Sequence, residues 1–156
     1  MDTNARQRIL FICMGNICRS PTAEGIARAE FARAGLDVDV DSAGTEDYHV
    51  GEPPDERAIR AAAAYGYDIA ELRARQVTSA DFERFDLVFA MDRMNLRALQ
   101  RFHRGLGVAP TLFLGDTELP DPYYGSARDF DRVVELSRKG VEGLIRRLRS
   151  PKARHG

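Results

Sequence analysis

The chain has 156 residues, 44% of them hydrophobic, which favours one domain over residues 1–156 that buries roughly two thirds of the surface of its unfolded chain. Charged residues make up 30% of the chain with a net charge of −1, so the composition excludes a disordered chain and a globally basic nucleic-acid-binding protein. No segment reaches the ~20 apolar residues of a membrane helix, and the first residues lack an apolar signal segment, so we expect a cytoplasmic protein with no membrane partner. We also expect flexible ends at residues 1–6 and 150–156.

The first predicted strand covers residues 7–13, where β-branched residues precede a Gly-Asn turn signal. Ser20 is a good N-cap and Pro21 suits the first helical position, so a helix follows whose mostly apolar stripe ends at Gly35. Apolar and acidic residues then alternate over residues 36–41, with the period of a strand that has one face in water. This pattern predicts a strand at the edge of a sheet.

The second half of the chain alternates between helical and extended patterns. The uninterrupted apolar run 87–91 is typical of a central strand covered on both faces, and Asp92 can cap a helix that runs to about residue 102. Apolar residues at helical spacing from Phe130 to Leu148 predict the last helix. The remaining predicted elements are helices over 54–65 and 79–85, a strand over 111–114, and loops over 45–54 and 115–125.

Strands that alternate with helices predict right-handed crossovers, and therefore a parallel sheet with helices on both faces. In such α/β folds, ligands bind at the carboxyl ends of the strands. Cys13, Ser42 and Asp92 lie at the ends of three predicted strands. We therefore expect them to gather at one edge of the sheet, together with the loop after Leu114.

A short polar loop separates Cys13 from Arg19 and leads straight into the first helix. A strand that runs into a helix N-terminus forms an anion site, because backbone N–H groups and the positive end of the helix dipole converge there. Phosphate is the natural occupant, with the thiol below it and the guanidinium at one side. Since helix N-termini and cations lower the pKa of a cysteine, we interpret Cys13 as a nucleophile. The alternatives are a small buried hydrophobic residue for Cys13 and a solvated helix start for Arg19.

The residues inside this loop are less decisive. Gly15 and Asn16 suit positive φ angles that turn the amides inward, but a plain tight turn uses the same residues. The hydroxyl of Ser20 either caps the helix or donates to a Cys13 thiolate, and both roles are compatible. The expected phosphate-binding loop consists of Met14, Gly15, Asn16, Ile17 and Cys18 between the cysteine and the arginine.

The two cysteines are too few for a disulfide scaffold or for a zinc site with paired ligands. Cys18 is interpreted as a packing residue, and a second hypothesis is a reversible disulfide with an oxidised Cys13. Basic residues also gather at the end of the chain. They are interpreted as a solvated helix end, with a partner site as the alternative: Arg146, Arg147, Arg149, Lys152 and Arg154.

Phosphoryl transfer to sulfur requires a proton donor for the leaving oxygen and then a base for water, and one carboxyl group can serve as both. Asp121 is the candidate, although Asp-Pro is also an ordinary turn signal. Tyr123 and Tyr124 beside it form either an aromatic wall or part of the core. The three histidines show no metal-ligand spacing, so we predict neither a metal nor a cofactor.

Three motifs together resemble the low-molecular-weight protein tyrosine phosphatases: Cys-Met-Gly-Asn-Ile-Cys-Arg-Ser-Pro over 13–21, Asp-Ser-Ala-Gly-Thr over 41–45, and Asp-Pro-Tyr-Tyr over 121–124. They occur in the order and spacing of that family, and the match extends over nearly the whole chain. The resemblance implies a single, flavodoxin-like α/β domain with a four-stranded parallel sheet in the order 2-1-3-4. It also implies hydrolysis of phosphotyrosine in proteins, and of small aryl phosphates, with phosphate or another oxyanion bound in the Cys-X5-Arg loop.

The resemblance assigns a role to each catalytic candidate. Cys13 forms a phosphocysteine intermediate, Arg19 binds the phosphoryl oxygens, and Asp121 acts as acid and then as base. Asn16 is held with Ser20 and Ser42 in a hydrogen-bond network that supports the thiolate. A histidine that often joins this network aligns with Leu72, so that part of the network is altered in this chain. The residues that align with the substrate walls are Ile17, Tyr48, Tyr123 and Tyr124, the last two also at possible phosphorylation positions.

Three other functions remain as alternatives. Bacterial protein arginine phosphatases share the loop but typically carry threonine at the position of Ile17, so the isoleucine favours phosphotyrosine. Thioredoxin-coupled arsenate reductases need further cysteines, and this chain has none beyond Cys18. A catalytically silent phosphate-binding module would not need Cys13, Arg19 and Asp121 together.

Overall fold

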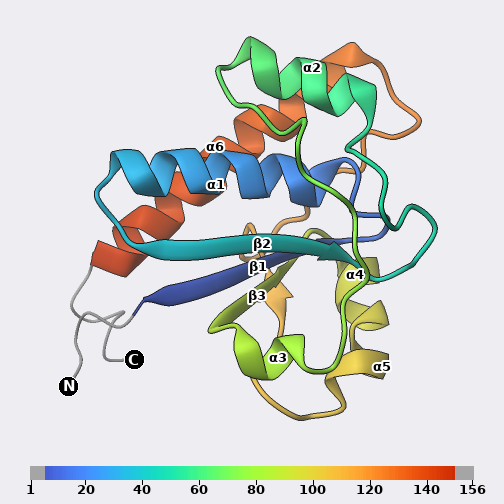
Figure 1. The fold of residues 1–156 in the computed structure, drawn as a ribbon, viewed down its shortest axis with the longest axis vertical. Coiled ribbons are helices and arrows are strands. Elements are labelled where there is room, and N and C mark those ends of the chain that lie inside the picture. The colour runs from blue at the N-terminus through green and yellow to red at the C-terminus, as the bar shows by residue number, and fades with distance from the viewer. Residues whose placement is uncertain (1–5, 150–156) are drawn as a thin grey trace.

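Four parallel strands form one sheet in the order β2-β1-β3-β4 at the centre of the molecule (Figure 1). The strands of the computed structural model are β1 (Gln7–Cys13), β2 (Val38–Gly44), β3 (Leu87–Ala90) and β4 (Thr111–Leu112). All three strand pairs are parallel, and β2 lies at an edge. The predicted sheet, its strand order and its edge strand are therefore confirmed.

The structure describes residues 6–149. Residues 1–5 and 150–156 lie outside the described residues, as do Lys152 and Arg154 of the basic end. Flexible ends and the extent of the single domain therefore stay predictions.

Helices cover both faces of the sheet, as the alternation of strands and helices predicts (Figure 1). The three longest helices lie together on one face, where α1 and α2 both contact α6. They are α1 (Arg19–Arg33), α2 (Glu56–Ala64) and α6 (Ala127–Arg149). Short helices lie on the opposite face: α3 (Asp81–Arg84), α4 (Arg93–Ala98) and α5 (Gln100–His103).

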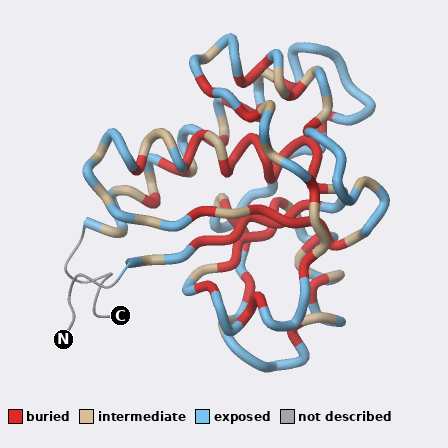
Figure 2. The backbone as a smooth tube through the Cα atoms, in the orientation of Figure 1, coloured by how far each residue is buried: buried red, intermediate tan, exposed pale blue. Residues whose placement is uncertain are grey.

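Residues 9–13 of β1 are buried (Figure 2). Successive side chains of a strand point to opposite faces of its sheet, so β1 is covered on both faces. Ile9 and Phe11 belong to the core beneath α1, α2 and α6, whereas Leu10 and Ile12 belong to the core beneath the short helices. Phe11 meets Phe113 edge to face, with ring centroids 5.1 Å apart. Because β1 is fixed from both sides, the loop that follows it starts from a rigid position.

Some element boundaries differ from the predictions. The first helix begins at Arg19 with Cys18 in the N-cap position, and no side chain caps it, so the prediction of Ser20 as N-cap is wrong. The Ser20 hydroxyl instead faces Cys13. Asp92 does cap α4, by accepting from the backbone N–H of Asn95 at 2.8 Å. The predicted helix from 92 to 102 is divided into α4 and α5, which meet at the fully buried Leu99.

None of the helices in the described part of the chain is both long and apolar enough to cross a membrane.

Candidate active site

The loop between β1 and α1, residues 13–19, has its carbonyl groups turned outward; we call it the Cys13 loop. The carbonyl oxygens of Cys13 and Met14 accept hydrogen bonds from Thr45 and Glu46 at 2.9 and 3.0 Å. The carbonyl of Ile17 accepts from the backbone N–H of Asp55 at 2.8 Å. In a trans peptide the C=O and the following N–H point in opposite directions. The N–H groups that follow these carbonyls therefore turn to the inner side of the loop, where they can bind an oxyanion.

Asn16 holds the loop in this shape. Its φ of 59° is in the left-handed region, which asparagine tolerates better than most residues. Its side-chain oxygen accepts from the backbone N–H of Arg75 at 3.0 Å, which fixes the orientation of the amide. The amide nitrogen then donates to the hydroxyls of Ser20 and Ser42 at 2.8 and 2.9 Å. The predicted association of Asn16, Ser20 and Ser42 is thus present.

From the side-chain amide of Asn16, hydrogen bonds run in two directions, through Ser20 toward the sulfur of Cys13 and through Ser42 toward Glu24. Ser20 accepts from Asn16, so its own proton is free to be donated, and its oxygen lies 3.0 Å from the Cys13 sulfur. Ser42 accepts from the same amide and donates to Glu24 at 2.6 Å. A hydroxyl that donates to a thiolate stabilises the ionised form. The arrangement therefore favours a nucleophilic sulfur at position 13.

Gly44 allows the end of β2 to approach the Cys13 loop closely. A Cβ atom at this position would lie 2.6 Å from the carbonyl oxygen of Met14 and 3.2 Å from the backbone nitrogen of Asn16. Distances this short require the backbone to move, so a side chain here is incompatible with the observed loop.

Arg19 is buried and reaches across the site to two other segments. One of its nitrogens donates to Asp92 and to the carbonyl of Leu119, both at 2.8 Å, and the other lies 3.8 Å from the carboxylate of Asp121. Burial disfavours the charged guanidinium, but Cys13 and Asp92 outweigh this effect, and the pKa of Arg19 is raised. A permanently charged, oriented guanidinium suits a bound oxyanion.

Asp121 lies in a loop over residues 115–125, which we call the Asp121 loop. Its carboxylate is 44% exposed and also accepts from the backbone N–H of Tyr123 at 3.1 Å. The distance of 3.8 Å to Arg19 places it beside the Cys13 loop. An exposed carboxyl beside a buried sulfur and arginine is suitably placed to exchange protons with a ligand and with water.

The second cysteine has a different environment. Cys13 and Cys18 are both buried and both free thiols. Burial, followed by the proximity of Cys13, raises the pKa of Cys18 far above its ordinary value. Cys18 is therefore a protonated packing residue, as expected, and its disulfide with Cys13 stays a prediction.

The predicted wall residues have exposed side chains, except Ile17. Ile17 is buried within the Cys13 loop, whereas Tyr48 and Tyr124 are 65% and 96% exposed. Tyr123 is partly exposed and meets Tyr124 edge to face, with centroids 4.9 Å apart. The alternative that both tyrosines are core residues is wrong.

Sequence reasoning missed several residues of the site. Glu24 and Arg75 complete the hydrogen bonds of Ser42 and Asn16. Asp92 was expected at this edge of the sheet, but its hydrogen bond with Arg19 was not. Glu24 could have been found, because it is an acidic residue on the buried stripe of α1. His49 also lies against the loop: a Cβ atom on Gly15 would be 3.0 Å from its ring.

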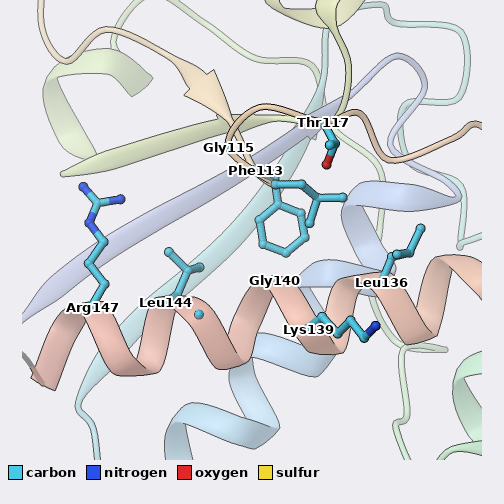
Figure 3. Close-up of a pocket in the computed structure, with 10 residues that line it drawn as sticks. Phe113, Gly115, Thr117, Leu136, Lys139, Gly140, Leu144 and Arg147 are labelled. Atoms are coloured by element: carbon cyan, nitrogen blue, oxygen red, sulfur yellow. The ribbon is translucent and has the colours of Figure 1, made fainter.

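Within residues 6–149, no group of three or more His, Cys, Asp and Glu side chains is placed to hold a metal ion. A cavity of about 430 Å³ lies elsewhere, between α6 and the segment that follows β4 (Figure 3). Phe113, Leu144, Lys139 and Arg147 are among the residues that line it, and none of the predicted site residues does. This cavity is therefore separate from the site around Cys13.

Comparison with known proteins gives the family. Residues 8–154 match the family model described as low molecular weight phosphotyrosine protein phosphatase. The chain belongs to this phosphatase family. It is 40% identical to the low molecular weight protein-tyrosine-phosphatase of Streptomyces coelicolor over 91% of this chain and 93% of that protein. It is 37% identical to the human low molecular weight phosphotyrosine protein phosphatase over 86% of this chain and 91% of the human protein.

Solved structures of this phosphatase family have the same fold. A protein tyrosine phosphatase of Entamoeba histolytica, described with Hepes in its active site, has a TM-score of 0.86 and 35% identity and covers 94% of this chain and 99% of its own. Wzb of Vibrio vulnificus, solved in complex with benzylphosphonate, has a TM-score of 0.82 and 28% identity. The match covers 91% of this chain and 99% of the Wzb chain. This phosphatase is accordingly a hydrolase of the protein tyrosine phosphatase class.

Proposed function

We propose that the enzyme hydrolyses phosphotyrosine in proteins, and small aryl phosphates, through a phosphocysteine intermediate on Cys13. Arg19 binds the phosphoryl oxygens, Asp121 is the general acid and base, and no metal takes part. The observation that supports the proposal is that Arg19 connects the loop of the Cys13 sulfur with the carboxylate of Asp121. The Cys13 sulfur is 3.0 Å from a hydroxyl with a free proton, and Arg19 lies on the same loop, 3.8 Å from Asp121.

In the first step the Cys13 thiolate attacks phosphorus and the bond from phosphorus to the aryl oxygen breaks. Asp121 gives its proton to the departing oxygen, so the product leaves as a neutral phenol. The charge on the phosphoryl oxygens is met by Arg19 and by the inward N–H groups of the Cys13 loop. Ser20 stabilises the thiolate before the attack and when it is released again.

In the second step a water molecule attacks the phosphocysteine. Asp121, now ionised, takes a proton from the water, the sulfur-phosphorus bond breaks, and inorganic phosphate and the Cys13 thiolate are formed. The proton that Asp121 lost in the first step is thereby restored, and no oxidant or reductant is required. The exposure of the Asp121 carboxylate, 44%, gives water access to it.

The preference for aryl phosphates rests on the walls of the site. Tyr123 and Tyr48 expose flat rings, and Ile17 contributes an apolar side chain to the loop itself. A phosphorylated tyrosine presents a ring that can stack on such walls, whereas phosphoserine does not. The Vibrio vulnificus relative has been solved in complex with benzylphosphonate, in which one CH2 group separates an aromatic ring from the phosphonate. Ile17 also favours phosphotyrosine over phosphoarginine.

The proposal is tested by turnover of a tyrosine-phosphorylated peptide and of the same peptide with phosphoserine. We expect hydrolysis of the phosphotyrosine peptide, loss of activity in Cys13→Ser, and most of the activity kept in Cys18→Ser, which changes the other thiol of the same loop. Wild-type enzyme that binds the peptide without hydrolysing it would be a binding module. Activity that survives Cys13→Ser would overturn the mechanism.

A further inference from the structure

Arg57, in the first turn of α2, lies between the two loops that carry the proposed catalytic groups. On one side its guanidinium forms two hydrogen bonds with the carboxylate of Asp55, at 3.0 and 2.9 Å. Asp55 also caps α2 by accepting from the backbone N–H of Arg57, and its own backbone N–H donates to Ile17 of the Cys13 loop at 2.8 Å. Arg57 is thus joined through Asp55 to the Cys13 loop.

On the other side, the guanidinium of Arg57 lies against two aromatic rings. Its central carbon is 4.6 Å from the ring centroid of Phe130 and 5.4 Å from that of Tyr123. Both distances are within the ~6 Å range of cation–π interactions. Phe130 is buried in the core at the start of α6, whereas Tyr123 belongs to the Asp121 loop and is partly exposed. The guanidinium therefore links a fixed ring to a ring on a surface loop.

Tyr123 is directly connected to Asp121. The backbone N–H of Tyr123 donates to the Asp121 carboxylate at 3.1 Å, so the position of one residue constrains the other. Leu119, earlier in the same loop, is held at 2.8 Å by the backbone of Met91 and by Arg19. The Asp121 loop is therefore held at two points, at Leu119 before Asp121 in the sequence and at Tyr123 after it, where Arg57 makes its contact.

We infer that Arg57 is a positioning residue that aligns the acid Asp121 with the nucleophile Cys13 by joining the two loops through Asp55 and Tyr123. This inference rests on the proposed roles of Cys13 and Asp121. Arg57 touches neither the sulfur nor the carboxylate of Asp121, so its effect passes through the residues that it holds. A displacement of about 1 Å can cost roughly 100-fold in rate, so alignment of this kind is measurable.

The test uses two substrates that depend differently on a general acid. Phenolate is a poor leaving group and needs the proton, whereas p-nitrophenolate is stabilised by its nitro group and needs it less. We expect Arg57→Met to lower kcat/KM about tenfold or more for phenyl phosphate and only a few-fold for p-nitrophenyl phosphate. Arg57→Lys, which keeps the charge but not the paired hydrogen bonds, should fall between wild type and Arg57→Met.

Arg60→Met is the matched control. Arg60 is on the same helix, its side chain is 70% exposed, and it pairs with Glu56 at 3.7 Å. The control should keep the wild-type ratio of the two kcat/KM values. Tyr123→Leu removes the same contact from the loop side. Because Tyr123 is also a proposed substrate wall, both kcat/KM values should fall, and the ratio between them should shift against phenyl phosphate as in Arg57→Met.

An unchanged ratio of the two kcat/KM values in both Arg57→Met and Tyr123→Leu would overturn the inference. Asp121→Asn separates this failure from failure of the proposed mechanism. If Asp121→Asn shows the selective loss and the Arg57 variants do not, the positioning role alone is wrong. If Asp121→Asn itself shows no selective loss, Asp121 is not the acid. When Arg57→Met is combined with Asp121→Asn, it should change the ratio of the two kcat/KM values little further, because the acid that Arg57 aligns is already absent.

Discussion

The hydroxyl of Ser42 donates a hydrogen bond of 2.6 Å to the carboxylate of Glu24, and both residues are buried. Ser42 in turn accepts from Asn16, so Glu24 ends a chain of hydrogen bonds that begins at the Cys13 sulfur. On its outer side Glu24 pairs with the exposed Arg28. Because Glu24 accepts the proton of Ser42, the oxygen of Ser42 is left to accept from the Asn16 amide.

Glu24→Leu removes this acceptor. We expect kcat/KM for p-nitrophenyl phosphate to fall about tenfold, the equivalent of one net hydrogen bond. Glu24→Gln keeps an oxygen that can accept from Ser42 and should lose much less. Glu30→Leu on the same helix, whose carboxylate pairs with Arg33, is the control and should keep full activity. An active Glu24→Leu enzyme would show that Ser42 orients the loop without help.

Glu24 also makes a prediction about pH. Burial raises the pKa of its carboxyl above the ordinary value of 4.5, so the folded state binds this proton more tightly than the unfolded state does. The stability that this group contributes is therefore complete below pH 4.5 and is lost as the pH rises through the folded pKa. Urea unfolding across this range should show wild type losing stability relative to Glu24→Gln. A difference that stays constant, or that grows in favour of wild type, would contradict the raised pKa.

Gly44→Ala tests the close approach of β2 to the Cys13 loop. The added Cβ would lie 2.6 Å from the Met14 carbonyl, so we expect a loss of roughly 1 to 3 kcal/mol in unfolding free energy and a lower kcat/KM. In Gly143→Ala the nearest atom that the new Cβ meets is a nitrogen of Arg146, 3.7 Å away. That helical substitution should stabilise by about 0.5 to 1 kcal/mol without changing activity. Equal effects of the two substitutions would mean that Gly44 is not needed for the loop.

EDTA should leave turnover of p-nitrophenyl phosphate unchanged, because Arg19 and the loop N–H groups carry the charge stabilisation in the proposed mechanism. The enzyme is treated with the chelator, passed through a desalting column and assayed with and without divalent cations. Activity that is lost after this treatment and returns with a metal ion would reject the metal-free mechanism.

Local patterns were sufficient to predict the sheet and the Cys13 loop. The buried run before Cys13 and the turn residues after it determine β1 and the start of α1 almost alone. The alternation over residues 36–41 likewise indicated the edge strand. These elements are defined by neighbours in the sequence, which is why their type could be read from it, whereas the strand order 2-1-3-4 was implied by the family resemblance.

The parts that could not be predicted depend on contacts between distant segments. Arg75 binds Asn16 only because the segment before α3 runs beside the Cys13 loop. Arg57 on α2 contacts Tyr123 of the Asp121 loop, and nothing in the sequence around either residue indicates this contact. The division into α4 and α5 at the buried Leu99 is likewise not indicated by the helical pattern of residues 92–102.

The central claim is that Cys13 carries the phosphoryl group, and trapping the intermediate tests it most directly. Enzyme is mixed with p-nitrophenyl phosphate, quenched during turnover and digested with trypsin, which releases residues 9–19 with both cysteines. We expect phosphate on Cys13 in the wild type, and more of it in Asp121→Asn, because water attack then lacks its base. Turnover with no phosphate on this peptide, or with phosphate on another residue, would contradict the mechanism.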